Sequence, residues 1–197
     1  MLKFVVRLCL ILGLIQPVMA FAEDAGGGEY GTRKGYSNKA PAGLSNSTTN
    51  RVARLIQRSG PQCQRLDKVY RYDCYRVAYT LAAREMEGKA AYAEAYKAVA
   101  KVANLLNREV SRNLDRKAPA IQRRGQTFRP VTPQAAPKIK AKATRAIEEA
   151  ETTLLRSASS KGNHYTKIAA ALNSNKVLLR AMLRLLPGMR AVLTEIA

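Results

Sequence analysis

Histidine, cysteine and acidic residues are scarce in this sequence, and each shortage excludes a class of protein. The one histidine, His164, cannot by itself supply a histidine-based catalytic triad or a multi-histidine metal site. The three cysteines contain no C-x-x-C pair, so the usual redox-active arrangement is absent. The densest acids, Glu148, Glu149 and Glu151, would point in different directions on a helix, and nothing places a second acid opposite them. We therefore expect no enzyme, no metal site, no cofactor and no small-molecule substrate.

Strand patterns are also missing. No stretch shows sustained alternation of apolar and polar residues, and no glycine-rich phosphate loop follows a strand. Helical periodicity, in contrast, recurs along most of the chain. The sequence therefore predicts an all-α fold, a bundle of about five helices made of two helical hairpins.

The first 22 residues resemble a bacterial signal peptide. Lys3 and Arg7 precede a short apolar run, residues 8–18, and Ala20-Phe21-Ala22 has the small-x-small pattern of a cleavage site. The apolar run is too short to span a bilayer, and no second long one follows. We expect cleavage after Ala22 and a periplasmic or secreted protein.

Two cysteines, Cys63 and Cys74, remain after that cleavage, because Cys9 lies in the leader. An even count in an oxidising compartment favours a disulfide. On one unbroken helix their Cα atoms would be roughly 16 Å apart, whereas a disulfide needs about 4.4–6.8 Å. Cys63 must therefore precede the helix that carries Cys74 and fold back towards it, which the turn signal Ser59-Gly60-Pro61 would allow.

The excess of positive charge is large, with 34 Lys and Arg against 14 Asp and Glu and a net charge of +20. Such a surface attracts polyanions. For an exported bacterial protein these are lipid headgroups, lipopolysaccharide, wall polymers or, less favoured, nucleic acid. The alternative is that the charge is merely solvated.

The chain divides into five segments by composition. Residues 1–22 are the leader, and the glycine-rich residues 23–47 are expected to form a disordered arm. Residues 48–116 would form a disulfide-stapled helical hairpin and residues 138–197 a second one. Residues 117–137 contain four of the eight prolines and would be a basic linker or a functional loop.

Apolar residues recur every three or four positions in each expected helix. The first helix starts near Thr48, capped by Ser47, Thr48 or Thr49, and ends at Ser59-Gly60-Pro61. The others are expected over about 66–87, 90–114, 138–159 and 164–186. The second would bury Leu66, Tyr70, Cys74, Val77 and Leu81.

A run without acids, between Asp115 and Glu148, is the most unusual local feature. It combines prolines, an uncompensated positive field and Phe128. A flexible basic segment can lie along an anionic surface, where each basic group contributes on the order of 1 kcal/mol. The candidate anion-binding residues are Arg123, Arg124, Arg129, Lys138, Lys140 and Lys142. The competing interpretation is an extended, solvated linker.

Three further features have a functional and a structural interpretation each. Tyr72, Tyr75 and Tyr79 could stack on bases or sugars, but aromatics at helical spacing are more often core. The end of the last helix, with Lys176, Arg180 and Arg184 beside many leucines, suits a membrane interface or a bundle core. His164 is most simply a polar residue near a helix start.

These observations predict a non-catalytic binding or adaptor protein of the bacterial cell envelope that engages an anionic partner. The alternative is a structural or protein-interaction subunit that uses its apolar last helix.

Overall fold

The computed structural model describes residues 43–181, and these residues form an all-α fold, as the sequence predicts. The α-helices are α1 (Asn46–Gln64), α2 (Arg71–Arg84), α3 (Ala93–Arg112), α4 (Ala136–Lys161) and α5 (Asn163–Ala181). A 3-10 turn, η1 (Ala90–Tyr92), leads into α3, and a small hairpin of β1 (Ile121–Arg123) and β2 (Gln126–Phe128) precedes α4. The predicted leader, nearly all of the predicted arm and residues 182–197 lie outside the described residues.

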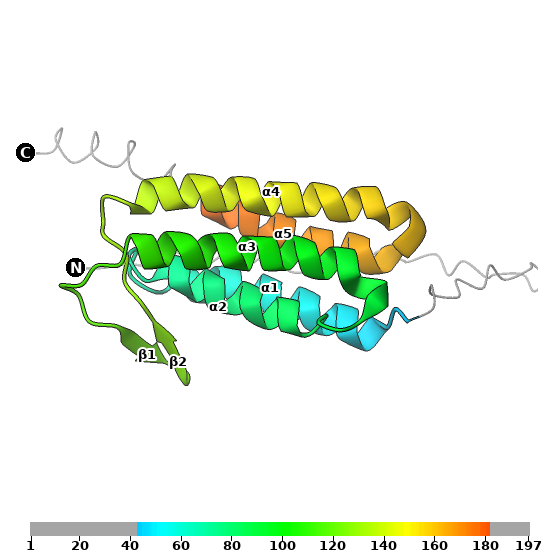
Figure 1. The fold of residues 1–197 in the computed structure, drawn as a ribbon, viewed down its shortest axis with the longest axis horizontal. Helices are drawn as coiled ribbons and strands as arrows, with labels where there is room; N and C mark the ends of the chain where they lie inside the picture. The colour runs from blue at the N-terminus through cyan, green and yellow to red at the C-terminus, as the bar shows by residue number, and fades with distance from the viewer. Residues whose placement is uncertain (1–42, 182–197) are drawn as a thin grey trace, which may run out of the picture. The chain divides into compact units, whose positions relative to one another are not determined.

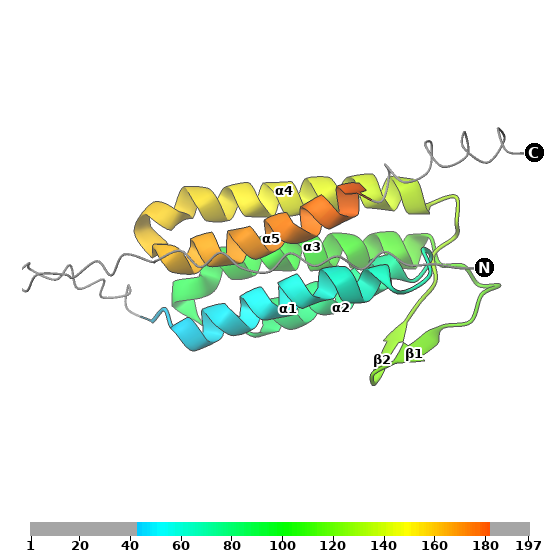
Figure 2. The same cartoon turned by 180° about the vertical axis from the view of Figure 1, so that it is seen from behind.

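The five helices form a closed ring in which each packs on its neighbours in sequence (Figures 1 and 2). α5 also packs on α1, which closes the ring. Consecutive helices alternate in direction, so the first and the fifth run parallel. Their hydrogen bonds follow this parallel register, since Thr49 meets His164 near the two starts and Gln64 meets Leu178 near the two ends.

The helix α1 continues past the predicted stop at Ser59-Gly60-Pro61 and ends at Gln64. A proline inside a helix removes one backbone hydrogen bond. Burial of Ser59, Gly60 and Cys63 against the neighbouring helices offsets that loss. The observed cap is Ser45, whose hydroxyl accepts a hydrogen bond from the backbone N–H of Thr48 at 3.2 Å, so the helix starts two residues earlier than predicted.

The disulfide is confirmed. The Cα atoms of Cys63 and Cys74 are 5.6 Å apart. Cys63 lies in the last turn of α1 and Cys74 in the first turn of α2, so the bridge joins the ends of two antiparallel helices.

The buried face of α2 agrees with the predicted one only in part. Tyr70 and Cys74 are buried as predicted, but Leu81 is 36% exposed. The other residues of α2 that enter the core are Tyr72, Tyr75, Tyr79, Ala82 and Ala83. Tyrosine rings bury more apolar area than the predicted aliphatic stripe, and the helix is turned to bring them inward. The packing interpretation of the three tyrosines is therefore confirmed.

The apolar periodicity expected in the later helices agrees better with the residues that the structure buries. In α3 the buried residues include Val99, Ala103, Leu106 and Val110, whereas Leu114 lies beyond the helix and is exposed. In α4 the buried residues include Ile139, Ala143, Ile147, Ala150 and Leu154, which recur every three or four positions. α4 ends at Gly162, whose φ of 58° lies in the left-handed region that favours glycine.

The expected absence of strands is wrong at one place, the β1–β2 hairpin. Arg124 and Gly125 both have positive φ, as the two-residue turn of a tight hairpin requires. Each strand has three residues, too few to produce a recognisable alternation. Phe128 and the fully buried Val131 anchor the segment, and the Val131 N–H donates to the Val69 carbonyl at 3.0 Å.

Candidate functional site

The six residues predicted to bind anions do not share one solvent-facing surface. Arg123 and Arg124 are exposed at the tip of the hairpin, and Lys138 is exposed in the first turn of α4. Arg129, Lys140 and Lys142 make their contacts inside the bundle or are buried in it. The predicted group therefore consists of three exposed cations and three that are either ion-paired with residues of the bundle or buried in it.

Arg129 is held by a buried carboxylate that the sequence did not single out, Asp73 of α2. Asp73 has no exposed surface and forms ion pairs with Arg76 at 2.5 Å and with Arg129 at 2.9 Å. The backbone N–H of Arg129 also donates to Asp73, at 2.9 Å. Burial of Asp73 acts to raise its pKa, but the hydrogen bonds from Arg76 and Arg129 outweigh it together, and the pKa is lowered. The result is a clamp that fastens the hairpin to α2.

Lys140 and Lys142 have different environments on α4. Lys142 donates to the Glu109 carboxylate of α3 at 2.6 Å. Lys140 is buried, and its Nζ atom has no hydrogen-bond partner in the part of the chain that the structure describes. Burial lowers the pKa of Lys140. Lys140 is therefore withdrawn from the surface, whereas Lys142 is partly exposed and already paired with Glu109.

The tyrosines of α2 belong to a polar network inside the core. Asn175 of α5 lies fully buried and its amide nitrogen is within hydrogen-bond distance of the Ile56 carbonyl, the Ser59 hydroxyl and the Tyr79 hydroxyl. Burial raises the pKa of Tyr72 to about 12, and it also raises the pKa of Tyr79. The helices approach closely here, because a Cβ atom on Gly60 would lie 2.5 Å from Asn175 Oδ1.

His164 is a buried network residue and not simply a polar residue at a helix start. Its Nδ1 atom is 2.7 Å from the Thr49 hydroxyl, which is 2.8 Å from the Tyr92 hydroxyl. Tyr92 donates its single hydroxyl hydrogen to the Ser45 carbonyl at 2.8 Å. Thr49 must therefore donate to Tyr92, and the hydrogen on His164 must sit on Nδ1. The chain of hydrogen bonds ties the start of α5 to the start of α1.

The acidic cluster of α4 and the basic strip of α5 pair largely with other residues of the bundle. Glu151 pairs with Lys176, Glu148 with Arg180 at 3.0 Å, and Glu149 with Lys101 at 2.7 Å. The third basic residue of the strip, Arg184, lies outside the described residues. Two of its three cations therefore already have carboxylate partners.

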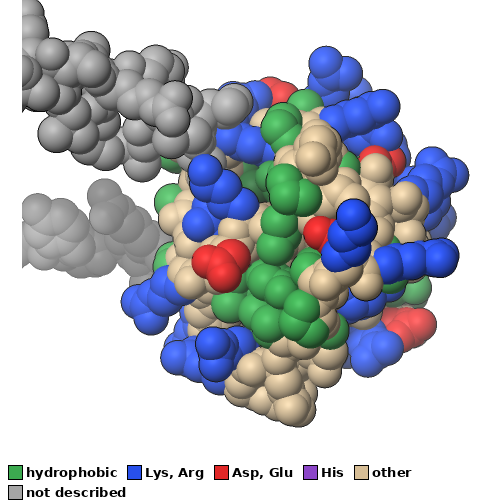
Figure 3. Space-filling view, turned by 90° about the vertical axis from the view of Figure 1, so that its left-hand side faces the viewer, with side chains coloured by type: hydrophobic (Ala, Val, Ile, Leu, Met, Phe, Trp, Pro, Cys, Tyr) green, Lys and Arg blue, Asp and Glu red, His purple; other side chains and the backbone are tan. Residues whose placement is uncertain are grey.

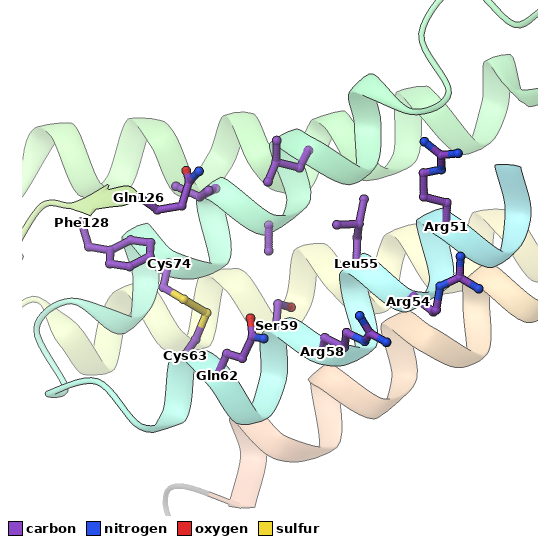
Figure 4. Close-up of a pocket in the computed structure, with 13 residues that line it drawn as sticks. Arg51, Arg54, Leu55, Arg58, Ser59, Gln62, Cys63, Cys74, Gln126 and Phe128 are labelled. Carbon is purple, nitrogen blue, oxygen red and sulfur yellow. A yellow bond between two sulfur atoms is a disulfide. The ribbon is translucent and has the colours of Figure 1, made fainter. Parts of the chain in front are cut away.

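An elongated groove lies on the outer surface where α1 meets α2, closed at one end by the hairpin (Figure 4). It encloses about 360 Å³. Its floor is apolar and consists of Leu55, Val77, Ala78, Leu81, Phe128 and the Cys63–Cys74 disulfide. Three of the residues that the sequence assigned to the buried face of α2, Cys74, Val77 and Leu81, thus line this groove.

Three arginines of α1 line the same groove, and we name it the arginine groove. They are Arg51, Arg54 and Arg58, at positions i, i+3 and i+7, which places them on one side of the helix. Arg51 pairs with Glu85 at 3.5 Å. Arg54 and Arg58 are exposed, and neither has an ion-pair or hydrogen-bond partner among residues 43–181.

The sequence does contain a signal for the three arginines of α1, although the sequence-based prediction did not include them. The helix α1 contains no acidic residue at all, and its three arginines recur at helical spacing. The prediction instead selected cations in the longer acid-free run around the hairpin. The fold shows that two of those cations, Arg129 and Lys142, already form ion pairs. Arg54 and Arg58 of α1 have no such partner among the described residues.

The end of the bundle that carries the hairpin and the start of α4 is also rich in positive charge. Figure 3 views this end and shows Lys and Arg side chains around most of its margin, with acidic side chains at several points between them. These cations lie at the hairpin end of the arginine groove and add positive charge there.

The described residues contain neither a metal-ligand cluster nor a candidate membrane span. Among residues 43–181 no group of three or more His, Cys, Asp or Glu side chains is placed to hold a metal ion. Within the same range no helix combines the length and the apolar character that a membrane span requires. Comparison with protein-family models, with curated proteins and with solved structures finds no match.

Proposed function

We propose that the protein is a non-catalytic binding protein of the bacterial cell envelope that engages an anionic partner. One observation carries the proposal: Arg54 and Arg58 lie side by side on an apolar groove with no acidic partner in the described residues. A guanidinium group stays protonated, and its planar fork pairs with carboxylate or phosphate through two hydrogen bonds. Such groups on a groove wall are suited to capture an anion.

The rest of the molecule supports the same function. The net charge of +20 draws anionic partners from a distance, and Arg123, Arg124 and Lys138 add exposed positive charge. The signal-peptide pattern of residues 1–22 and the Cys63–Cys74 bridge support export to an oxidising compartment. The proposed binding site is therefore the arginine groove, with the hairpin tip as a secondary contact.

Vesicle retention tests this proposal. The probe is a phosphatidylglycerol-containing vesicle, and the variant is Arg54→Glu with Arg58→Glu. We expect at least tenfold weaker retention at 50 mM salt than for the unaltered protein, and a steep loss of the native retention between 50 and 200 mM salt, because each released counterion adds to the salt dependence.

The matched control is Arg145→Glu with Arg156→Glu on α4, which changes the net charge equally at exposed positions away from the groove. It should keep most of the retention. Equal loss in both variants would show that only net charge matters, and no loss in the Arg54 and Arg58 variant would remove the groove from the proposal.

A second function, a protein-interaction subunit that uses the apolar face of α5, is favoured by one observation. Val177 of α5 is 55% exposed, which leaves a large aliphatic side chain at the surface of this helix. An apolar interface responds little to salt. A complex that survives 200 mM salt unchanged and is lost on Val177→Asp would support this function over anion binding.

A further inference from the structure

We infer that the arginine groove binds a single-chain amphiphile, an aliphatic chain that ends in a phosphate or carboxylate group. This inference rests on the proposed function, because it accepts anion binding and names the chemical class of the ligand. It is carried by the polarity, the size and the wall chemistry of the groove.

The positive charge of the groove lies towards one end. Figure 4 shows Arg51 and Arg54 at that end and Arg58 with Leu55 in the middle. Phe128 and the disulfide lie at the other end, beside the uncharged side chains of Gln62 and Gln126. From Arg51 to Cys63 the helix α1 advances roughly 18 Å. A ligand with its charge at one end and an apolar body along its length matches this order of residues.

The size of the groove suits a narrow ligand. It is open along one side and offers about 360 Å³. A flexible aliphatic chain is narrow enough to lie along its floor.

The walls also offer little to an extended peptide. The walls are mainly helices, whose backbone groups are already bonded within α1 and α2. The Ser59 hydroxyl already donates a hydrogen bond to the Ile56 carbonyl, at 2.6 Å. A bound peptide would find partners for its own N–H and C=O groups mainly in Gln62, Gln126 and water. An aliphatic chain needs no such partners.

The two parts of the ligand would make separate contributions. The head group would pair with the guanidinium groups of Arg54 and Arg58, and Arg51 would add charge at the same end. The chain would cover Leu55, Val77 and Phe128. Affinity should therefore rise about fourfold for each added methylene that reaches the floor, and fall when either part is missing.

Calorimetric titration of the full mature chain tests the inference, with probes kept below their micelle concentrations. Decyl phosphate and decanoate distinguish the two head groups, inorganic phosphate lacks the chain, and decanol lacks the charge. We expect decyl phosphate or decanoate to bind at least tenfold more tightly than either incomplete probe. Octyl phosphate should bind roughly 16-fold more weakly than decyl phosphate if phosphate is the preferred head.

Two kinds of variant locate the site. Ala78→Phe fills the floor without changing charge, and Leu81→Trp does the same at a more exposed position should the first variant fail to fold. Each should weaken decyl phosphate binding at least tenfold. Arg54→Gln with Arg58→Gln should do likewise, whereas Arg145→Gln with Arg156→Gln on α4 should leave binding unchanged.

The outcomes separate this inference from the proposed function. If vesicle retention depends on Arg54 and Arg58 but no amphiphile binds, the inference fails and anion binding stands. If retention and amphiphile binding are both insensitive to the groove variants, both fail. Equal affinity for inorganic phosphate and decyl phosphate, or tight binding of an acidic peptide that Ala78→Phe weakens, would overturn the inference alone.

Discussion

At the scale of single residues, Asp73 shows how a charge can be placed inside this bundle. A carboxylate without exposed surface is costly unless it is paired and hydrogen-bonded. Asp73 meets that condition through the side chains of Arg76 and Arg129 and the backbone N–H of Arg129. Its function is therefore structural, since it fixes the hairpin that closes one end of the arginine groove.

Replacing Asp73 by Asn should lower the free energy of unfolding at pH 7 by about 1.5–3 kcal/mol, because it removes hydrogen bonds to charged groups. The pKa of Asp73 is lowered in the folded protein, so protonation favours the unfolded chain. The stabilisation by Asp73 is complete above about pH 5 and is lost as the pH falls below the ordinary carboxyl range.

Denaturant unfolding at a series of pH values checks this prediction. The difference between the native protein and the Asp73→Asn variant should shrink below pH 4. Asp67→Asn, an exposed acid that precedes the same helix, serves as control and should change stability by less than about 0.5 kcal/mol. A difference that stays constant down to pH 2 would contradict the assignment.

At the scale of elements, α1 and α2 are the pair on which the proposed site depends. The disulfide joins the last turn of α1 to the first turn of α2, and it also forms part of the floor of the arginine groove. The bridge therefore holds the two walls of the groove together at the end opposite Arg51. The bundle core of both helices lies on their other sides.

Replacing Cys63 and Cys74 by Ala together should cost about 3 kcal/mol of stability, as the loop-entropy treatment gives for a loop of this length. Reductant should destabilise the native protein by a similar amount and leave the double variant unaffected. Urea unfolding with and without reductant measures both effects. Two thiols that react with an alkylating reagent in the native, non-reduced protein would show that the bridge does not form.

At the scale of the whole described unit, the closing contact between α1 and α5 turns two hairpins into one ring. Asn175, His164 and Gln64 all take part in hydrogen bonds across it. At Gly60 the two helices are so close that no side chain larger than hydrogen fits without movement. The five helices should therefore unfold together.

Replacing Ile168, a fully buried residue of α5, by Ala should cost about 2–5 kcal/mol. Because the ring unfolds as a unit, the amide protons of α2 and α3 should lose protection along with those of α5. Native-state hydrogen exchange measures this residue by residue. Protection that falls only in α4 and α5 would instead indicate two independent halves.

Much of the candidate site could not be predicted from the sequence, because it depends on which helix faces pack together. Periodicity shows that α2 has an apolar face, but both the tyrosine face and the Val77–Leu81 face have helical spacing. Which of the two faces enters the core depends on the partner helices. The ion pairs of Arg129 with Asp73 and of Lys142 with Glu109 depend on them too. The arginine row of α1 was visible in the spacing, yet its lack of acidic partners was not.

The amino-acid sequence by itself determined the helical class, the approximate extent of four later helical stretches and the pairing of Cys63 with Cys74, because these follow from local periodicity and chain geometry. Tertiary structure alone decided that α1 continues through Pro61, that the acid-free connection forms a hairpin, and that an apolar groove beside three arginines remains open. These features depend on contacts between residues far apart in the chain, where burial of one group is offset by a partner that no local pattern identifies.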